Sequence, residues 1–160
     1  MNITAAVITV SDRSFRKERE DLSGPAVAKV LSDAGVGVKS TVIVPDDQKQ
    51  ISSILRLCAD RDHLSLAVTT GGTGVAKRDV TPEATVAICD KLIPGIAELM
   101  RSEGLKKTPL SPLSRAVCGT RGTTLILNLP GNPNGAVESL TSVMPLIMHA
   151  IELLAGNTEH

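Results

Sequence analysis

Apolar and polar positions along the chain follow two alternating periods. Runs rich in valine, isoleucine and leucine are typical of strands, and they predict extended segments over residues 3–10, 38–44, 64–70 and 124–129, with a shorter one over 114–119. Between these runs apolar residues recur three and four positions apart, which is the spacing of one helix face. Two such faces are formed by Val27, Val30, Leu31 and Ala34, and by Ile51, Ile54, Leu55 and Cys58.

The second half of the chain predicts three more helices. Two short helices are expected over residues 82–92 and 96–106, separated by Pro94-Gly95. A longer helix is expected over residues 137–154, where apolar residues keep helical spacing. Pro145 lies inside this last pattern and is expected to kink or split the helix, because proline removes one hydrogen bond of the ladder.

Candidate helix starts are marked by small polar residues and prolines. Gly24, Thr81 and Asn132 each precede a proline, so each is expected to be the N-cap of a helix whose first residue is that proline. Asp47 is expected to cap the helix that follows the second strand. Helix N-termini carry free N–H groups and a positive dipole end, which favours phosphate binding nearby.

Strands that alternate with helices predict an α/β fold with a three-layer α/β/α arrangement and a mostly parallel, doubly wound sheet. Crossovers of this kind are right-handed, and ligands bind outside the carboxyl ends of the strands. The segments that follow the four main strands are polar or rich in glycine and proline, and we expect them to share one edge of the sheet. They are Ser11-Asp12-Arg13, Pro45-Asp46-Asp47, Gly71-Gly72-Thr73-Gly74 and Pro130-Gly131-Asn132-Pro133.

Composition narrows the class of protein. The 160 residues fit one domain over residues 1–160, and 42% hydrophobic with 21% charged residues is typical of a globular protein, not of a disordered, collagenous or coiled-coil chain. The sequence suggests neither an apolar run of about 18 residues nor a signal peptide, so a cytoplasmic protein without a membrane span is expected. Seventeen basic and seventeen acidic residues cancel, and with one Phe and no Tyr or Trp a nucleic-acid interface is not expected.

The sulfur and imidazole side chains are not spaced as metal ligands. Cys58, Cys89 and Cys118 lie far apart in apolar contexts and are expected to be reduced core residues. A zinc site needs closely spaced pairs of ligands, which these cysteines and the histidines His63, His149 and His160 do not supply. The histidines also lie outside every motif, so they are expected to be non-catalytic.

The glycine-rich segment after the third predicted strand is followed by a charged one. Gly71-Gly72-Thr73-Gly74 matches neither a dinucleotide fingerprint nor a P-loop, and by itself it is as compatible with a tight turn. Lys77 and Arg78 could neutralise phosphates or lie in solvent. Asp46 and Asp79 would come from adjacent loops, and two carboxylates with substrate phosphates are what Mg²⁺ usually requires.

As an ordered set, these segments resemble the molybdenum-cofactor biosynthesis family, in particular its MogA type and the G domains of gephyrin and its plant counterpart. The resemblance runs from about residue 3 to residue 154. It rests on Ser11-Asp12-Arg13, Pro45-Asp46, residues 69–74, residues 78–85, Leu113-Ser114-Arg115 and residues 128–133.

The resemblance implies molybdopterin adenylyltransferase activity, in which molybdopterin and Mg-ATP give adenylyl-molybdopterin and pyrophosphate. It implies that Asp46 and Asp79 are the essential acidic pair that holds Mg²⁺, directly or through water. It also implies a homotrimer and a separate molybdenum insertase as the downstream partner. By the same likeness, residues expected to bind nucleotide or pterin are Ser11, Asp12, Arg13, Gly71, Gly72, Thr73, Gly74, Lys77, Arg78, Ser114, Arg115, Asn128, Pro130 and Gly131.

Two departures and three alternatives accompany this resemblance. Residues 14–20 are highly charged where relatives usually carry glycine and an aromatic, and Lys77 stands where proline is common. The alternatives are a MoaB-type relative, a non-catalytic pterin carrier or scaffold trimer, and another nucleotide-dependent enzyme with this fold. The segment Leu129-Pro130-Gly131-Asn132-Pro133-Asn134 favours the adenylyltransferase type over the MoaB type.

Overall fold

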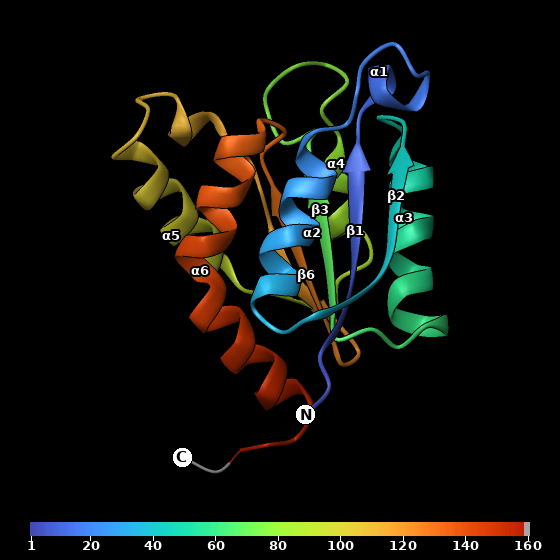
Figure 1. Cartoon of the computed structure of the whole chain (residues 1–160), viewed down its shortest axis with the longest axis vertical. Coiled ribbons are helices and arrows are strands. Elements are labelled where there is room, and N and C mark those ends of the chain that lie inside the picture. Colours follow the sequence, from blue (N-terminus) through green and yellow to red (C-terminus); the bar gives the residue numbers. More distant parts are fainter. Residues whose placement is uncertain (159–160) are drawn as a thin grey trace.

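The computed structural model describes residues 1–158, which fold around one six-stranded sheet (Figure 1). Its strand order is β2-β1-β3-β6-β5-β4. The first four strands in this order are parallel, whereas β5 pairs antiparallel with β6, and β4 pairs antiparallel with β5. The strands are β1 (Thr4–Val10), β2 (Gly37–Val44), β3 (Leu66–Thr70), β4 (Lys91–Leu92), β5 (Cys118–Arg121) and β6 (Thr124–Leu129).

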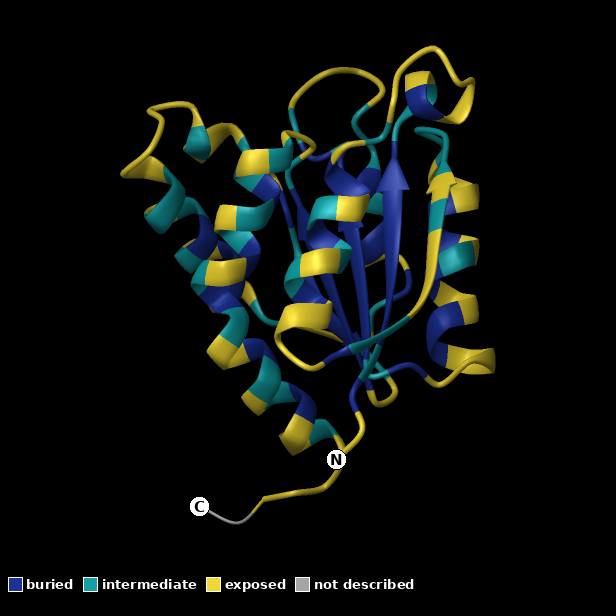
Figure 2. Ribbon diagram, in the orientation of Figure 1, coloured by how far each residue is buried: buried dark blue, intermediate teal, exposed yellow. Residues whose placement is uncertain are grey.

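Helices cover both faces of this sheet because successive side chains of a strand point to opposite faces. Ala5 and Val7 of β1 pack in one apolar cluster with α2 (Ser23–Asp33), α5 (Pro94–Leu105) and α6 (Pro133–Leu154). Ala6 and Ile8 pack in the other cluster, with α3 (Gln48–Arg56) and α4 (Thr81–Val86). The central strands are buried on both faces, while the edge strand β2 is largely exposed (Figure 2). The predicted three-layer, mostly parallel α/β architecture is therefore confirmed.

The sequence predictions for one helix and one strand in the second half are wrong. The helix expected over residues 82–92 ends at Val86, and Lys91–Leu92 form β4 instead, where the Asp90 and Ile93 N–H groups donate to carbonyls of β5. The strand expected over residues 114–119 begins only at Cys118. In both places partners distant in sequence override the local pattern, because a short segment gains more from pairing with the sheet than from its own periodicity.

Helix starts agree only in part with the expected caps. Asn132 caps α6 and Asp47 caps α3, each side chain accepting a hydrogen bond from the N–H three residues on. Gly24 and Thr81 are not N-caps, because α2 begins at Ser23 and α4 begins at Thr81 itself. The Gly24 N–H instead donates to the carboxylate of Asp21 (3.0 Å).

Helix α5 begins at Pro94, so Pro94-Gly95 lies inside its first turn and does not precede it. The long α6 is continuous across Pro145, so the expected split does not occur. Short helical turns complete the chain: α1 (Asp12–Phe15) within the charged segment, a π-helical turn η1 (Leu57–Arg61), and a 3-10 turn η2 (Ser111–Leu113).

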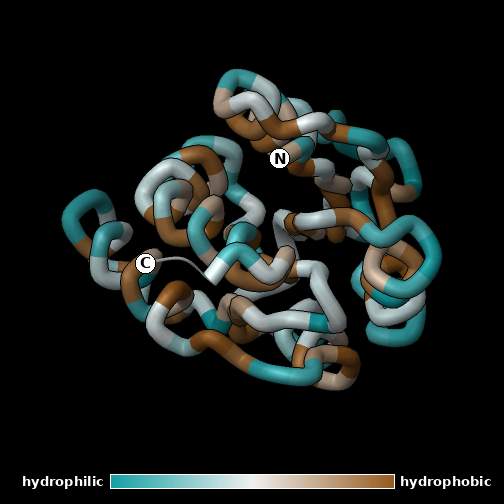
Figure 3. The backbone as a smooth tube through the Cα atoms, turned by 90° about the horizontal axis from the view of Figure 1, so that it is seen from below, coloured by the Kyte–Doolittle hydropathy of each residue, from teal (hydrophilic) through white to brown (hydrophobic). Residues whose placement is uncertain are grey.

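By length and composition alone, α6 could cross a membrane, a test that the core helix of a soluble protein also passes. Its residues Ala136, Leu140, Val143, Ile147 and Ile151 are buried in the cluster shared with α2 and α5. Along the backbone tube, hydrophobic and hydrophilic stretches alternate, and many hydrophilic ones lie on the periphery (Figure 3). The apolar face of α6 is thus used in the core.

Candidate functional site

The four polar segments that follow the parallel strands do meet at one edge of the sheet, at the top of Figure 1. The segment after β3 is central, because β3 lies between β1 and β6 in the sheet. Its first N–H, that of Gly71, donates to the carbonyl of Leu129 at the end of β6 (3.0 Å). The expectation that these segments gather at one edge is confirmed.

Gly71 and Gly72 adopt backbone conformations that other residues rarely reach, with φ of +103° and +67°. A Cβ on Gly71 would collide with the carbonyl oxygen of Val10. A Cβ on Gly72 would collide with the Thr81 hydroxyl and lie 3.0 Å from Asp46 Oδ1. The turn is therefore built for glycine, and its backbone lies directly against the carboxylate of Asp46.

Asp46 is held by the loop that follows β1. Its Oδ2 accepts the N–H of Asp12 (2.9 Å), and its own N–H donates to Asp12 Oδ1 (3.0 Å). Burial is the main cause that raises the pKa of Asp46, and the nearby carboxylates of Asp12 and Asp79 raise it further. Such a carboxylate gains from a cation, since a bound cation offsets both burial and repulsion.

Asp79 ends the loop that begins with the glycines. Its Oδ2 accepts the N–H of Ala76 (3.0 Å) and lies 2.8 Å from where a Cβ of Gly74 would stand. The N–H of Asp79 donates to the Ala76 carbonyl (3.0 Å), so the loop is closed by a short turn. The carboxylate is thereby aimed back at the glycine loop.

Arg78 does not reach into this space. Its guanidinium makes a bidentate pair with Asp12, with Nε at 2.7 Å from Oδ2 and a second nitrogen at 2.9 Å from Oδ1. This hydrogen bonding is the main cause that lowers the pKa of Asp12. The structure thus places the expected phosphate-binding cation on Asp12, where it braces the segment that holds Asp46.

Two cavities open at this edge. The larger, of about 1050 Å³, lies between the glycine loop, the α5–η2 segment and the first turns of α6. The smaller, of about 330 Å³, lies between the ends of β1 and β3, Asp46 and the segment from Arg19 to Ser23. The residues that line both cavities, and so mark where they meet, are Gly72, Asp79, Gly131 and Asn132.

The sequence-predicted residues divide between these cavities. Ser11, Gly71 and Asp46 line the smaller one, and Thr73, Gly74, Ser114 and Pro130 line the larger one. Asn128 lies beneath the site: it is fully buried, donates to the hydroxyls of Thr69 and Thr85, and accepts the N–H of Val117. In this structure its polar groups are occupied by these protein partners, and contact of Asn128 with a ligand stays a prediction. Among the described residues, neither cavity lining includes Asp12, Arg13, Lys77, Arg78, Arg115 or Asn128.

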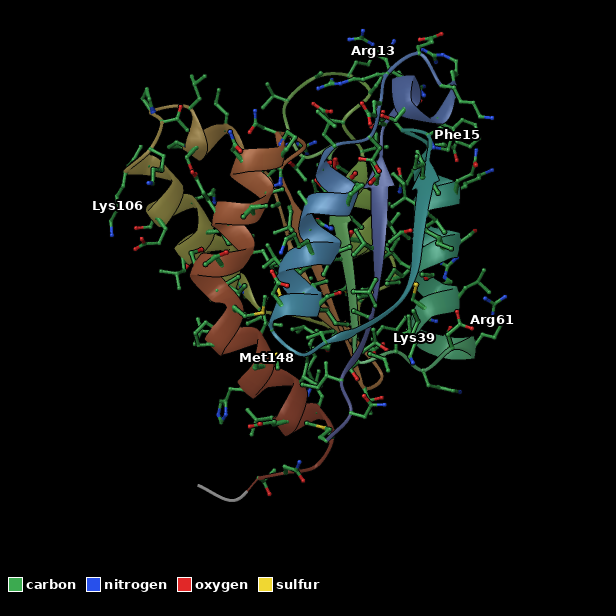
Figure 4. The ribbon with its side chains drawn as sticks, viewed as in Figure 1. Arg13, Phe15, Lys39, Arg61, Lys106 and Met148 are labelled. Atoms are coloured by element: carbon green, nitrogen blue, oxygen red, sulfur yellow. The ribbon has the colours of Figure 1, made fainter. Side chains whose placement is uncertain are left out.

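Arg13 is an exposed residue of α1 at the top of the molecule, in the same helical turn as the exposed Phe15 (Figure 4). Lys77 is also exposed, on the loop between Gly74 and Asp79. Among the histidines, His63 and His149 lie outside both cavity linings, and His160 lies outside the described residues. The linings of the two cavities instead carry carboxylates, hydroxyls, backbone groups and the cations Arg19, Arg101 and Lys107.

Sequence reasoning missed one wall of the larger cavity. Nine residues between Met100 and Leu113, on α5, η2 and the turn between them, line it together with seven residues of α6. Those of α6 are Asn134, Gly135, Val137, Glu138, Ser139, Thr141 and Ser142. Arg101 joins this wall to the neighbouring segment by donating to the carbonyls of Ser114 and Ala116. Nothing in the local sequence distinguishes these residues from ordinary helix surface, since only the packing of α5 beside α6 brings them to the site.

Comparison with known proteins agrees with this arrangement. The sequence profile of a family described as a probable molybdopterin binding domain matches residues 6–149. A molybdopterin adenylyltransferase from Helicobacter pylori is 43% identical over 158 residues, which is 97% of this chain and 89% of the relative. The chain belongs to the molybdopterin-binding family of molybdenum cofactor biosynthesis.

Solved structures of this family share the whole fold. A molybdopterin biosynthesis enzyme MoaB from Thermus thermophilus superposes with a TM-score of 0.91 at 51% identity, covering 96% of this chain and 97% of that one. A molybdopterin biosynthesis Mog protein from Mycobacterium ulcerans has a TM-score of 0.89 at 38% identity, covering 98% and 99%. Fold likeness therefore extends equally to Mog-type and MoaB-type members.

The acidic pair fits the metal that the family resemblance implies. Within residues 1–158, no cluster of three or more His, Cys, Asp or Glu could hold a metal by itself. Mg²⁺ needs fewer, because it is usually held by one or two carboxylates with substrate phosphates and waters. Asp46 and Asp79 each use Oδ2 in a backbone hydrogen bond, which leaves Oδ1 for such a ligand.

The cysteines are structural, as expected. All three are free thiols, with Cys58 and Cys118 buried and Cys89 half-buried. Burial is the main cause that raises the pKa of Cys58 and Cys89 to about 11 and that of Cys118 to about 12. None of the three lines either cavity within the described residues.

Proposed function

We propose that this chain is a molybdopterin adenylyltransferase, which transfers AMP from ATP to the terminal phosphate of molybdopterin and releases pyrophosphate. One observation carries the proposal: Asp46 and Asp79 flank a glycine turn at the point where two cavities meet. Two substrates can thus face each other across one acidic, glycine-lined boundary. The curated relatives at 40–43% identity carry this activity in their names.

The chemistry needs no general base. A phosphate oxygen of molybdopterin forms a bond to the α-phosphorus of ATP as the bond from that phosphorus to the bridging oxygen of pyrophosphate breaks. The attacking oxygen is already anionic at neutral pH, so no proton has to be removed. Transfer at phosphorus depends mainly on alignment and on neutralising charge, which suits a site whose carboxylates can hold a cation and whose cavity linings include Arg19, Arg101 and Lys107.

The chain's residues divide this work. Asp46 and Asp79 would hold Mg²⁺, which when bound neutralises phosphate charge and aligns the reacting groups. Gly71 and Gly72 let the chain turn tightly against Val10 and Thr81, where no Cβ would fit, and their backbone lines the cavity that phosphates would enter. Ser114 and Pro130 line the larger cavity, which is the one with room for a pterin. We assign the nucleotide phosphates to the boundary at Gly72 and Asp79.

A MoaB-type role is the second candidate, favoured by the 51% identity to the Thermus thermophilus MoaB structure. A pterin carrier or scaffold without catalysis is a third possibility, and a different nucleotide-dependent enzyme a fourth. A carrier has no need for two carboxylates beside the glycine turn or for a response to metal. Metal-dependent product formation therefore separates the adenylyltransferase from the carrier.

The same proposal extends to assembly and location. The family resemblance supports a homotrimer, a cytoplasmic location, and transfer of the product to a separate molybdenum insertase. The large cavity is open along α5 and α6, and a symmetric assembly would decide how much of it stays accessible. Sedimentation of the purified chain tests the trimer directly.

The decisive experiment is product analysis by mass spectrometry under anaerobic conditions. The protein is mixed with molybdopterin, ATP and Mg²⁺, and a parallel sample contains a chelator. We expect adenylyl-molybdopterin only in the sample with metal, and none from Asp79→Asn. The exposed Asp33, paired with Lys29 on α2, supplies the matched control Asp33→Asn, which should behave as the unaltered chain.

Other outcomes point to the alternatives. Molybdopterin that binds but stays unmodified supports the carrier or MoaB-type role. Conversion of a nucleotide with molybdopterin omitted supports a different nucleotide-dependent enzyme. Near-normal turnover by Asp79→Asn contradicts the role of the acidic pair.

A further inference from the structure

Arg115 binds the glycine loop from outside the site. Its Nε donates to the carbonyl of Gly74 (2.7 Å), and one terminal nitrogen donates to the carbonyl of Asp79 (2.8 Å). Its backbone N–H donates to the carbonyl of Thr73 (2.8 Å). One residue therefore holds both ends of the loop that runs from Thr73 to Asp79.

The remaining terminal nitrogen of Arg115 is held by Glu83 on α4. It lies 2.8 Å and 2.9 Å from the two carboxylate oxygens of Glu83. The guanidinium is thus anchored on a helix while its other donors face the loop. A lysine has no planar fork and could not make these bonds together.

The loop has few other anchors. Residues 75–78 are exposed, and the hydrogen bonds between Ala76 and Asp79 are internal to the loop, so they shape it without fixing its place. Arg78 makes an exposed pair with Asp12 outside the loop. Thr81 closes the base of the loop, because its N–H donates to the Gly72 carbonyl and its hydroxyl donates to the Gly71 carbonyl. Arg115 adds the bonds that hold the carbonyls of Gly74 and Asp79 to one guanidinium.

Arg115 and Glu83 lie outside both described cavity linings, whereas Thr73, Gly74 and Asp79 lie within the lining of the larger one. We propose that Arg115, oriented by Glu83, is a positioning residue that sets the place of the Asp79 carboxylate for the transfer step. It acts through the loop backbone and touches neither substrate. The expected effect on kcat rests on the proposed function. The claim that Arg115 holds the loop in place rests on the hydrogen bonds alone.

The test compares Arg115→Gln, Arg115→Lys and Glu83→Gln with a matched control. Arg121 offers the control because it makes the same kind of contacts, a bidentate pair with Asp60 and a bond to the Ile88 carbonyl, at the β5–β6 turn away from the site. Each variant is measured for kcat, for the KM of molybdopterin and for the Mg²⁺ concentration at half-maximal rate. Hydrogen exchange across residues 73–79 is followed in the same proteins.

We expect Arg115→Gln to lower kcat by about 10- to 100-fold, because a displacement near 1 Å can cost about that much. Half-maximal rate should require more Mg²⁺, while the molybdopterin KM changes less than about 2-fold, since no substrate contact is lost. Arg115→Lys should not restore the rate. Glu83→Gln should give a smaller loss, and the double variant should lose less than the product of the two single losses.

Hydrogen exchange separates this inference from the proposed function. Faster exchange confined to residues 73–79 in Arg115→Gln, and absent from Arg121→Gln, supports the positioning role even if the unaltered chain forms no adenylyl-molybdopterin. Unchanged exchange with unchanged kcat overturns it. A rise of about 10-fold or more in the molybdopterin KM at unchanged kcat also overturns it, because that pattern means a direct substrate contact.

Discussion

Asp12 and Asp46 hold each other reciprocally: the N–H of each donates to the carboxylate of the other, at 2.9 Å and 3.0 Å. The pair joins the loops that follow β1 and β2, which lie next to each other in the sheet. It leaves Asp46 Oδ1 turned toward Gly72. The position of the central carboxylate therefore depends on a neighbour that lines neither described cavity.

Asp46→Asn should abolish product formation and raise thermal stability at neutral pH. Because burial raises the pKa of Asp46, the folded chain favours the protonated carboxyl more than the unfolded chain does. The stability from this group is fully present below the unfolded pKa and is lost as pH rises through the folded pKa. Asparagine does not ionise, so the variant avoids this loss of stability. Its melting temperature at about pH 7 should therefore exceed that of the unaltered chain, and the difference should shrink toward about pH 4.

Asp47→Asn is the control for this substitution. Asp47 caps α3, and asparagine caps helices about as well as aspartate, so its stability and turnover should stay close to those of the unaltered chain. A lowered melting temperature for Asp46→Asn at neutral pH would contradict the account of Asp46.

Arg78→Gln should raise the pKa of Asp12, because the hydrogen bonds from Arg78 are what chiefly lower it. Because the pKa of Asp12 is lower in the folded state than in the unfolded state, its ionised carboxylate stabilises the fold at pH values above the unfolded-state pKa. This stabilisation is lost as the pH falls through the folded-state pKa. The variant loses this contribution at neutral pH, but the loss should be small because Arg78 is mostly exposed. An NMR titration of the Asp12 carboxyl measures the shift, and Lys29→Gln, in another exposed pair, is the control.

Gly72→Ala should remove activity and destabilise the chain, because the new Cβ would meet the Thr81 hydroxyl and Asp46 at a φ of +67°. Gly95→Ala is the control, since nothing lies within 4 Å of its Cβ and the residue is in α5. Alanine in a helix is favoured over glycine by about 0.5–1 kcal/mol, so this control should be slightly stabilised. Urea unfolding of both variants checks the contrast.

Asn128→Ala should destabilise the fold by about 2–4 kcal/mol, because it leaves a cavity and strips partners from Thr69, Thr85 and the Val117 N–H. Asn134→Ala, at an exposed position, should stay within about 0.5 kcal/mol. Equal stability of the two variants in urea would show that the buried amide is dispensable.

The thiols should react slowly in the folded protein. Their raised pKa values, about 11 to 12, leave little thiolate at neutral pH, and thiolate is the reactive form. Ellman's reagent should therefore label all three cysteines quickly in denaturant and only slowly in the native state. Cys89, which is half-buried, should react first.

The site was only partly foreseeable from the sequence. The polar segments after the strands, the glycine turn and the two aspartates were found because each follows a strand that the local pattern already predicts. The roles of Arg78 and Arg115 were not, since their partners Asp12 and Gly74 lie 66 and 41 residues away. In the sequence, a cationic side chain near a glycine loop indicates phosphate binding. The fold instead brings Arg78 to the carboxylate of Asp12 and Arg115 to the carbonyl of Gly74.

By itself, the sequence determined the layers of this protein, the edge at which the polar segments gather and the chemical types present there. These follow from short-range causes: side-chain periodicity fixes strands and helices, and parallel strands bring their following loops to one edge. Only the tertiary structure decided the end of α4, the short strand β4, the wall formed by α5 and the hydrogen bonds that brace Asp46 and Asp79. These depend on which strands and helices become neighbours, because a hydrogen bond forms only between groups that the assembled sheet brings within about 3 Å.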